Sequence, residues 1–154
     1  MWMRLAKFSI CNRMSVKELC TLLSLGDTDG EFAGNVSDLR RTGRWDQDAL
    51  ADVLEISISE VRDGFCSVMP GHSLARCSTE LRYCEQCLSV GFHAAWFQWT
   101  HIERCPLHSL PIRRGCFHCS SPIPYELGAG LALSPLCCTV CERDWVPTLT
   151  CARG

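Results

Sequence analysis

Seven cysteines and one histidine between residues 84 and 141 form four consecutive pairs, each with two residues between its members. That gap lets both side chains of a pair turn toward one point, and two such pairs complete the tetrahedral N/S site that Zn²⁺ favours. The intervals of 17 residues after Cys87 and 18 residues after Cys119 match the spacing of zinc sites. The sequence therefore predicts two zinc ions. Their predicted ligands are Cys84, Cys87, Cys105, His108, Cys116, Cys119, Cys138 and Cys141.

The spacing alone leaves open how the four pairs combine. Sequential combination, first pair with second and third with fourth, is favoured, but a cross-braced arrangement would join the first pair to the third. Only Cys138 keeps the two-residue gap to Cys141, so the adjacent Cys137 is the predicted spare. His93 and His101 have suitable chemistry but belong to no pair, and we expect His93 beside the site or in the core.

Both predicted sites are closed by four protein ligands, whereas a catalytic zinc keeps one position open for water. Neither predicted site has the H-x-E arrangement of zinc deaminases or the H-E-x-x-H arrangement of metalloproteases. A redox-active C-x-x-C would need a thioredoxin-like βαβ context, which the sequence does not suggest. We therefore expect structural zinc, no enzymatic activity and no small-molecule substrate.

Cysteine content and hydropathy indicate a reducing compartment. No apolar run reaches the length of a membrane helix, and the start of the chain is too polar for a secretory signal. The 13 cysteines are then expected to bind metal or lie in the core, and the expected location is the cytoplasm. The unpaired cysteines predicted to be small buried residues are Cys11, Cys20, Cys66, Cys77 and Cys151.

The charge balance argues against autonomous, tight DNA binding. The chain of 154 residues carries 15 Lys and Arg against 17 Asp and Glu, a net charge of −2. A Cys₃His zinc site adds −1 and a Cys₄ site adds −2, since the thiolates outnumber the metal charge. Proteins that hold DNA through its phosphates usually present a basic face, and the composition supplies no such excess.

The first part of the chain has helical signals. Residues 2–11 carry an apolar face, and Ser15 with Glu18 forms a capping box before a leucine stripe that Gly26 should end. Residues 26–44 are polar and predict a loop with one short turn around 36–39. Asp46 is a predicted N-cap, and a second capping box at 57–60 opens another helix with Val61 and Phe65 inside.

Helix, short turn and helix over 46–65 is the layout of a helix-turn-helix. Its second helix would offer Glu60, Arg62 and Asp63 to a DNA groove, which is poor chemistry for phosphates or guanine edges. Glu55 also stands where the tight turn often takes a glycine. A small helical bundle or a protein-binding face is therefore favoured over DNA recognition.

The second part has little regular structure. We expect a linker at 67–83 ending in an extended approach to Cys84, aromatic residues at 96–102 over the first site, and a strand at 109–115. His118 should face outward, 120–136 should be a loop or irregular hairpin, and Trp145 with Pro147 should close over the second site. The fold class is a small helical, helix-turn-helix-like domain at 1–70 followed by a tandem zinc-ribbon domain at 71–154.

The cysteine-rich stretch resembles the TniQ family of transposition proteins, and the helical segments at 2–20 and 49–65 are similar to that family as well, so the resemblance covers nearly the whole chain. The positions that match the family pattern are Arg82-Tyr83-Cys84, Gly91-Phe92-His93, Gln98, Cys105-Pro106-Leu107-His108, Cys116 and Cys119. Glu85 replaces the usual proline and Phe97 replaces a histidine. The family's stretch before Trp2 is missing, so we expect a clipped or mis-started chain. The short length is similar to the TniQ proteins of RNA-guided transposons.

The resemblance implies a non-enzymatic adaptor that selects transposition targets. Such proteins link a target-recognition complex, either a CRISPR effector or a DNA site, to an AAA+ ATPase that recruits the transposase, and they touch DNA within that assembly. Expected contact surfaces are Trp2, the helices at 15–25 and 46–65, or Arg113-Arg114. Two alternatives stay open: a sequence-specific DNA-binding regulator that uses the helix-turn-helix and zinc ribbons, and, well behind it, a thiol oxidoreductase.

Overall fold

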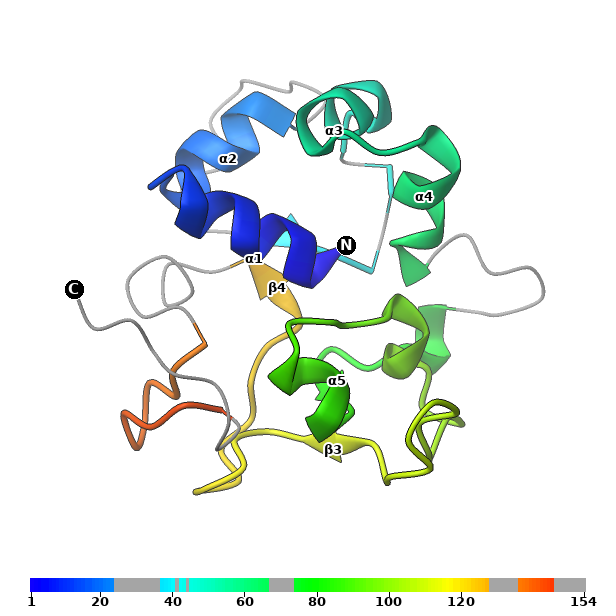
Figure 1. The fold of residues 1–154 in the computed structure, drawn as a ribbon, viewed down its shortest axis with the longest axis vertical. Coiled ribbons are helices and arrows are strands. Elements are labelled where there is room, and N and C mark those ends of the chain that lie inside the picture. The colour runs from blue at the N-terminus through cyan, green and yellow to red at the C-terminus, as the bar shows by residue number, and fades with distance from the viewer. Residues whose placement is uncertain (24–36, 41, 44, 67–73, 128–135, 146–154) are drawn as a thin grey trace.

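The computed structural model of the protein describes residues 1–23, 37–40, 42–43, 45–66, 74–127 and 136–145. The helices within residues 2–63 gather in one half of the molecule, and the other half consists of turns and one short helix that carry the cysteine pairs (Figure 1). The helices are α1 (Trp2–Cys11), α2 (Val16–Leu23), α3 (Gln47–Leu54), α4 (Ile58–Asp63) and α5 (Glu85–Ser89), with 3₁₀ turns η2 (Leu74–Arg76) and η3 (Ala95–Gln98). The strands are β1 (Ser37–Asp38), β2 (Arg82–Tyr83), β3 (Arg113–Arg114) and β4 (Glu126–Leu127).

Side-chain caps begin three of these helices where the sequence predicts them. Ser15 accepts from the backbone N–H of Glu18, whose carboxylate accepts from the Ser15 N–H at 2.8 Å. Asp46 accepts from two N–H groups at the start of α3, and Ser57 with Glu60 repeats the capping box before α4. Each cap satisfies backbone donors that the first helical turn leaves unpaired. The end predicted for the second helix at Gly26 lies outside the described residues.

Trp2 joins the two halves of the molecule. Its side chain is buried, its indole N–H donates to the Glu126 carbonyl at 3.3 Å, and its ring lies 5.5 Å from that of Trp145 and 5.6 Å from that of His93. One set of buried apolar residues accordingly runs from α1 to Trp145. Trp2 is therefore a core residue rather than the exposed contact that the resemblance suggested. The predicted domain boundary near residue 70 falls within 67–73, outside the described residues.

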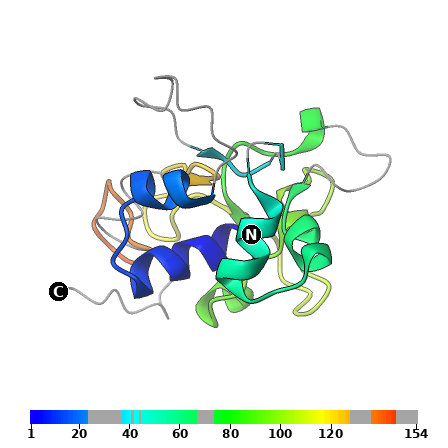
Figure 2. The same ribbon diagram turned by 90° about the horizontal axis from the view of Figure 1, so that it is seen from above.

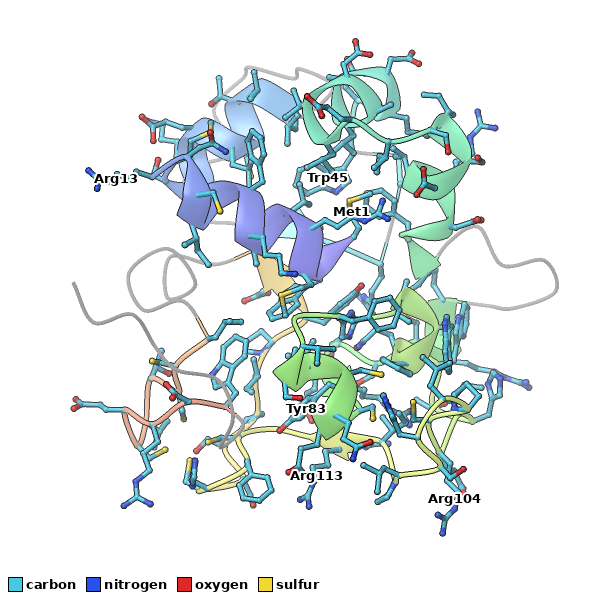
Figure 3. All side chains as sticks on the ribbon, in the orientation of Figure 1. Met1, Arg13, Trp45, Tyr83, Arg104 and Arg113 are labelled. Atoms are coloured by element: carbon cyan, nitrogen blue, oxygen red, sulfur yellow. The ribbon has the colours of Figure 1, made fainter. Side chains whose placement is uncertain are left out.

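In the helical half, the start of α1 contacts the end of α4. The amino group of Met1 donates to the carbonyl of Gly64 just after α4, at 2.8 Å. Trp45 is buried beside Phe65, and both labelled Met1 and Trp45 lie between the helices in Figure 3. Viewed from above, α1 and α2 lie side by side, with α4 next to the N-terminus (Figure 2).

Two short antiparallel pairs were not predicted as such. β1 pairs with β4, Ser37 opposite Leu127, where the sequence suggests only a turn around 36–39 and a loop over 120–136. β2 pairs with β3, Tyr83 opposite Arg113, so the strand expected within 109–115 is present but short. Residues 74–83 are not a plain linker, because Leu81 and Tyr83 are fully buried. A two-residue strand is too short to show a periodic pattern in the sequence. It forms because a segment far away in the chain pairs with it.

The α3–α4 corner uses Glu55 in the left-handed conformation, with φ 52° and ψ 46°, as the residue that ends α3. This is the position where the sequence marks a common glycine. The exposed polar groups of α4 bind within the molecule: Glu60 contacts Arg4 at 3.3 Å, and Arg62 donates to Gln47 at 3.1 Å. A DNA-reading role for this corner stays a prediction.

The cysteines outside the four ligand pairs differ in burial. Cys20, Cys66 and Cys77 are buried, as predicted. Cys11 is exposed, so its predicted burial is wrong. It follows Trp2 by nine residues, which on an α-helix places it on the side opposite that buried ring. Cys151 lies outside the described residues.

None of the helices in the described part of the chain is long and apolar enough to cross a membrane.

Candidate metal centres

The structure gathers the four pairs into two clusters, combined sequentially. Cys84, Cys87, Cys105 and His108 form the first cluster, and in each cluster all ligand atoms lie within 4.8 Å of one another. The second cluster consists of Cys116, Cys119, Cys138 and Cys141. Cys137 lies outside both and pairs its backbone with that of Asp144.

The separations within the clusters are the edges of a tetrahedron around a metal. With Zn–S near 2.3 Å and Zn–N near 2.0 Å, two sulfurs should lie about 3.8 Å apart and sulfur and nitrogen about 3.5 Å apart. The Sγ–Sγ distances are 3.7 Å for Cys87–Cys105, 3.7 Å for Cys116–Cys141 and 3.6 Å for Cys119–Cys138.

His108 fits the same geometry through one ring nitrogen. Its Nδ1 lies 3.4 Å from Cys84 Sγ, 3.3 Å from Cys87 Sγ and 3.7 Å from Cys105 Sγ. All these contacts are far longer than a disulfide, so the residues present suit a bound tetrahedral ion.

One backbone turn recurs at three of the four pairs and explains how local sequence positions the ligands. The first ligand's N–H donates to the carbonyl five residues on, and its carbonyl accepts from the N–H four residues on. At Cys105 these bonds are 2.8 and 2.7 Å, at Cys116 2.8 and 2.9 Å, and at Cys138 2.8 and 2.9 Å. The residue after each second ligand has positive φ: Ser109 at 56°, Ser120 at 59° and Glu142 at 56°.

The first pair is built differently. Cys84 is the N-cap of α5, so both of its cysteines are held by a helix rather than by the recurring turn. A salt bridge of 3.1 Å between Glu85 of α5 and Arg113 of β3 fastens this helix to the neighbouring strand pair. Arg113 and Arg104 lie at the edge of the molecule away from α1 (Figure 3).

Gly115 allows the third turn to close. Its φ is +66°, and a Cβ built there would lie 2.7 Å from the Ser121 carbonyl oxygen, the group that Cys116 N–H binds. Only glycine adopts this conformation without a side chain in the way. Backbone N–H groups also point at sulfur in the second cluster: those of His118 and Val140 lie 3.4 Å from the sulfurs of Cys116 and Cys138. Such donors stabilise thiolates.

The two clusters differ in their surroundings. Phe97 and Ala94 are buried with the three cysteines of the first cluster, and Trp96, Leu110 and Ile112 pack against them, so the predicted aromatic cover is present. In the second cluster Cys119 is exposed. Burial raises the pKa of the Cys87 thiol to about 12, whereas hydrogen bonding with Ser121 lowers the pKa of Cys119 to about 6. Burial and hydrogen bonding with the other thiols also raise the pKa of the Cys141 thiol in the second cluster to about 12, so metal binding to either cluster must displace at least one tightly held proton.

A buried polar network next to the first cluster supports the strand that leads into it. Gln98 donates to the Arg82 carbonyl at 2.8 Å and accepts from its N–H, and the protonated Nε2 of His93 donates to the same carbonyl at 2.9 Å. The Arg82 guanidinium donates to the carbonyls of Trp99 and Ile102. Nothing in the composition signals this role of Arg82 and Gln98, and only their places in the family-like motif single them out.

His93, His101 and His118 are not ligands of either cluster. His93 is a core residue, as expected, packed against the rings of Trp2, Phe97 and Tyr125. His118 is exposed, as predicted, and His101 is also exposed. Trp145 is buried against Trp2 next to the second cluster, while Pro147 lies outside the described residues.

Neither known protein-family models nor curated protein sequences gave a match to this chain. What the two clusters can do chemically therefore follows from their own geometry. Four donors lie within 4.8 Å of one another in each cluster, and this closed arrangement suits an ion that holds chain segments together.

Proposed function

We propose that each cluster holds one structural Zn²⁺ ion. The observation that carries this is the gathering of four donors within 4.8 Å in each cluster, with six donor pairs at 3.3–3.7 Å, close to the edges of a tetrahedron around zinc. Zinc prefers this donor set and this geometry, and Cys₃His and Cys₄ are both common structural combinations. The ions would tie together segments that are otherwise linked by little regular structure, so their binding free energy contributes to folding.

Metal analysis of the purified full chain tests the zinc proposal directly. We expect two zinc ions per chain, and chelation should abolish the tertiary structure of the cysteine-rich half, as monitored by near-ultraviolet circular dichroism. A protein purified from zinc-supplemented cells that contains no zinc, or one whose spectrum is unchanged after complete metal removal, would contradict it.

We further propose that the zinc-stabilised chain is a non-enzymatic adaptor in DNA transposition. The resemblance of the cysteine-rich motif to TniQ proteins supports this role, as do the balanced charge and the closed donor sets. The adaptor would join an AAA+ transposition regulator to a target-recognition complex, either a CRISPR effector or a DNA site, and contact DNA within that assembly. Candidate contact groups are α2, the α3–α4 corner and the exposed Arg113 and Arg114.

Two binding experiments separate this role from a DNA-binding regulator. The full chain should be retained by the AAA+ ATPase encoded beside its gene in a pull-down at physiological salt. It should bind duplex DNA only weakly, because α4 offers Glu60 and Asp63 alongside its single arginine. Submicromolar DNA binding that falls steeply with salt, without retention by the ATPase, would favour the regulator instead.

A further inference from the structure

The two clusters expose different ligand types to solvent. In the first cluster Cys84, Cys87 and Cys105 are at most 1% exposed, and the ligand that reaches the surface is His108. In the second cluster Cys119 is exposed and Cys141 is half-buried. Imidazole does not react with peroxides as a thiolate does, so the first cluster presents an inert ligand where the second presents an oxidisable one.

Cys119 also has a second sulfur within reach. Cys119 Sγ lies 3.6 Å from Cys138 Sγ, and both side chains already point at one centre. A disulfide needs sulfurs about 2.05 Å apart, so a shift of about 1.5 Å would suffice. Both neighbouring turns are on the surface, with Ser120 and Thr139 exposed, and can accommodate such a shift.

We propose that the second cluster is an oxidation-sensitive site at which hydroperoxides convert Cys119 and Cys138 to a disulfide and expel the metal. This inference rests on the proposed zinc occupancy. The Cys119 thiolate attacks the O–O bond of hydrogen peroxide, forming a sulfenic acid and releasing hydroxide. The Cys138 thiolate then attacks that sulfur, forming the disulfide and releasing a second hydroxide. Two thiolates lose two electrons and peroxide gains them, and the ion, left with two ligands, dissociates.

The change would be transmitted to the helical half through Trp145. Its carbonyl accepts from the N–H of Phe117 at 3.0 Å, between the two ligands of the third pair, and its ring packs against Trp2 at the start of α1. Loss of the second ion therefore loosens the support of α1, while the first cluster and its aromatic cover stay assembled. The second cluster would thereby couple the redox state of the cell to the packing of α1 against the rest of the molecule.

The test treats the zinc-loaded full chain with hydrogen peroxide while a chromogenic chelator reports zinc release. We expect one of the two ions to leave first, together with a disulfide that contains Cys119 in peptide mass spectra and with faster amide hydrogen exchange in α1. The exposed Cys11 also oxidises, but it cannot contribute to the zinc signal. Release of both ions in one phase, first oxidation at Cys84, Cys87 or Cys105, or retention of both ions would overturn the proposal.

Two reciprocal variants sharpen the test. Cys119→His gives the second cluster the donor set of the first, so it should bind two ions and release the second-site ion much more slowly. His108→Cys places an exposed thiol in the first cluster and should make that ion leave in the fast phase too. Unchanged fast release from Cys119→His, or unchanged retention in His108→Cys, would count against the mechanism. A wild-type protein isolated without zinc would instead refute the zinc proposal itself.

Discussion

The side-chain amide of Gln98 forms hydrogen bonds with both the N–H and the carbonyl of Arg82, as a neighbouring strand would on that side of β2. Gln98 is fully buried, and the strand it supports enters the first cluster two residues later. At the scale of single residues, the cysteines that supply the ligands are therefore held by side chains that supply none. A buried backbone group that loses its partner costs about 1–3 kcal/mol.

Gln98→Met tests that support. Methionine has a similar volume but cannot bond the Arg82 N–H and carbonyl, so we expect a loss of about 2–3 kcal/mol in the free energy of unfolding, measured by urea denaturation of the zinc-loaded protein. Gln86→Met, at an exposed position of α5, should change stability by less than about 0.5 kcal/mol. Equal effects of the two substitutions would contradict the assignment.

His93 predicts a pH dependence. Burial lowers its pKa to about 3 in the folded state from 6.5, with the nearby amino terminus adding to the effect. A histidine with a depressed pKa stays neutral in the fold while the unfolded chain takes up a proton. The contribution of neutral His93 to the free energy of unfolding is therefore complete above about pH 6.5. It is lost as the pH falls toward 3, at up to about 1.4 kcal/mol per pH unit.

His93→Phe should flatten this dependence. Unfolding free energies measured between pH 7.5 and 5 should fall less steeply in the variant than in the wild type, whatever slope the thiolate ligands add to both. His118→Gln, at an exposed histidine, should keep the wild-type slope. A variant slope identical to the wild type would show that His93 titrates normally in the fold.

Short elements carry conformational strain in this fold. Glu55, Ser109, Ser120 and Glu142 all have φ between 52° and 59°, a region where a Cβ is unfavourable, and three of them follow directly after a metal-ligand pair. The turns persist because their backbone hydrogen bonds and the adjacent ligands hold them. Of these four positions, only Glu55 was marked from the sequence as one where a tight turn often takes a glycine.

Glu55→Gly should stabilise the protein. Glycine adopts the left-handed conformation freely, which we expect to raise the unfolding free energy by about 0.5–1 kcal/mol and the melting temperature with it. Asp52→Gly, inside α3 and exposed, should lower it by about 1 kcal/mol because it weakens the helix. Destabilisation by Glu55→Gly would mean that this turn relaxes in solution.

At the scale of the whole molecule, Trp2 connects helices and metal clusters. It contacts β4 through its indole N–H, Trp145 beside the second cluster, and His93 near the first. Figure 1 shows β4 directly below α1, where these segments from distant parts of the chain meet. Such a shared core makes the two halves unfold together.

Trp2→Ala should destabilise the protein by about 3–5 kcal/mol and separate one thermal transition into two, observed by calorimetry of the zinc-loaded chain. Trp96→Ala, at a partly buried position over the first cluster, removes the same ring without cutting that connection. It should lower the melting temperature and retain a single transition. Two transitions already present in the wild type would refute the coupling.

Local sequence was enough to predict the ligand residues that the clusters bring together, the capped starts of α2, α3 and α4, and the outward position of His118. These features depend on interactions among residues three to five apart, such as the two-residue gap of each ligand pair and the capping of α2 by Ser15, so short stretches of sequence carry them.

Tertiary structure decided which pairs share a centre, the pairing of β1 with β4, the exposure of Cys11 and the burial of Trp2. The strand pairing and the burial of Trp2 depend on segments far apart in the chain, up to 143 residues as between Trp2 and Trp145. Such contacts arise from packing in three dimensions, where an apolar residue of suitable size can pack against many different neighbours. They therefore leave no periodic pattern in the sequence.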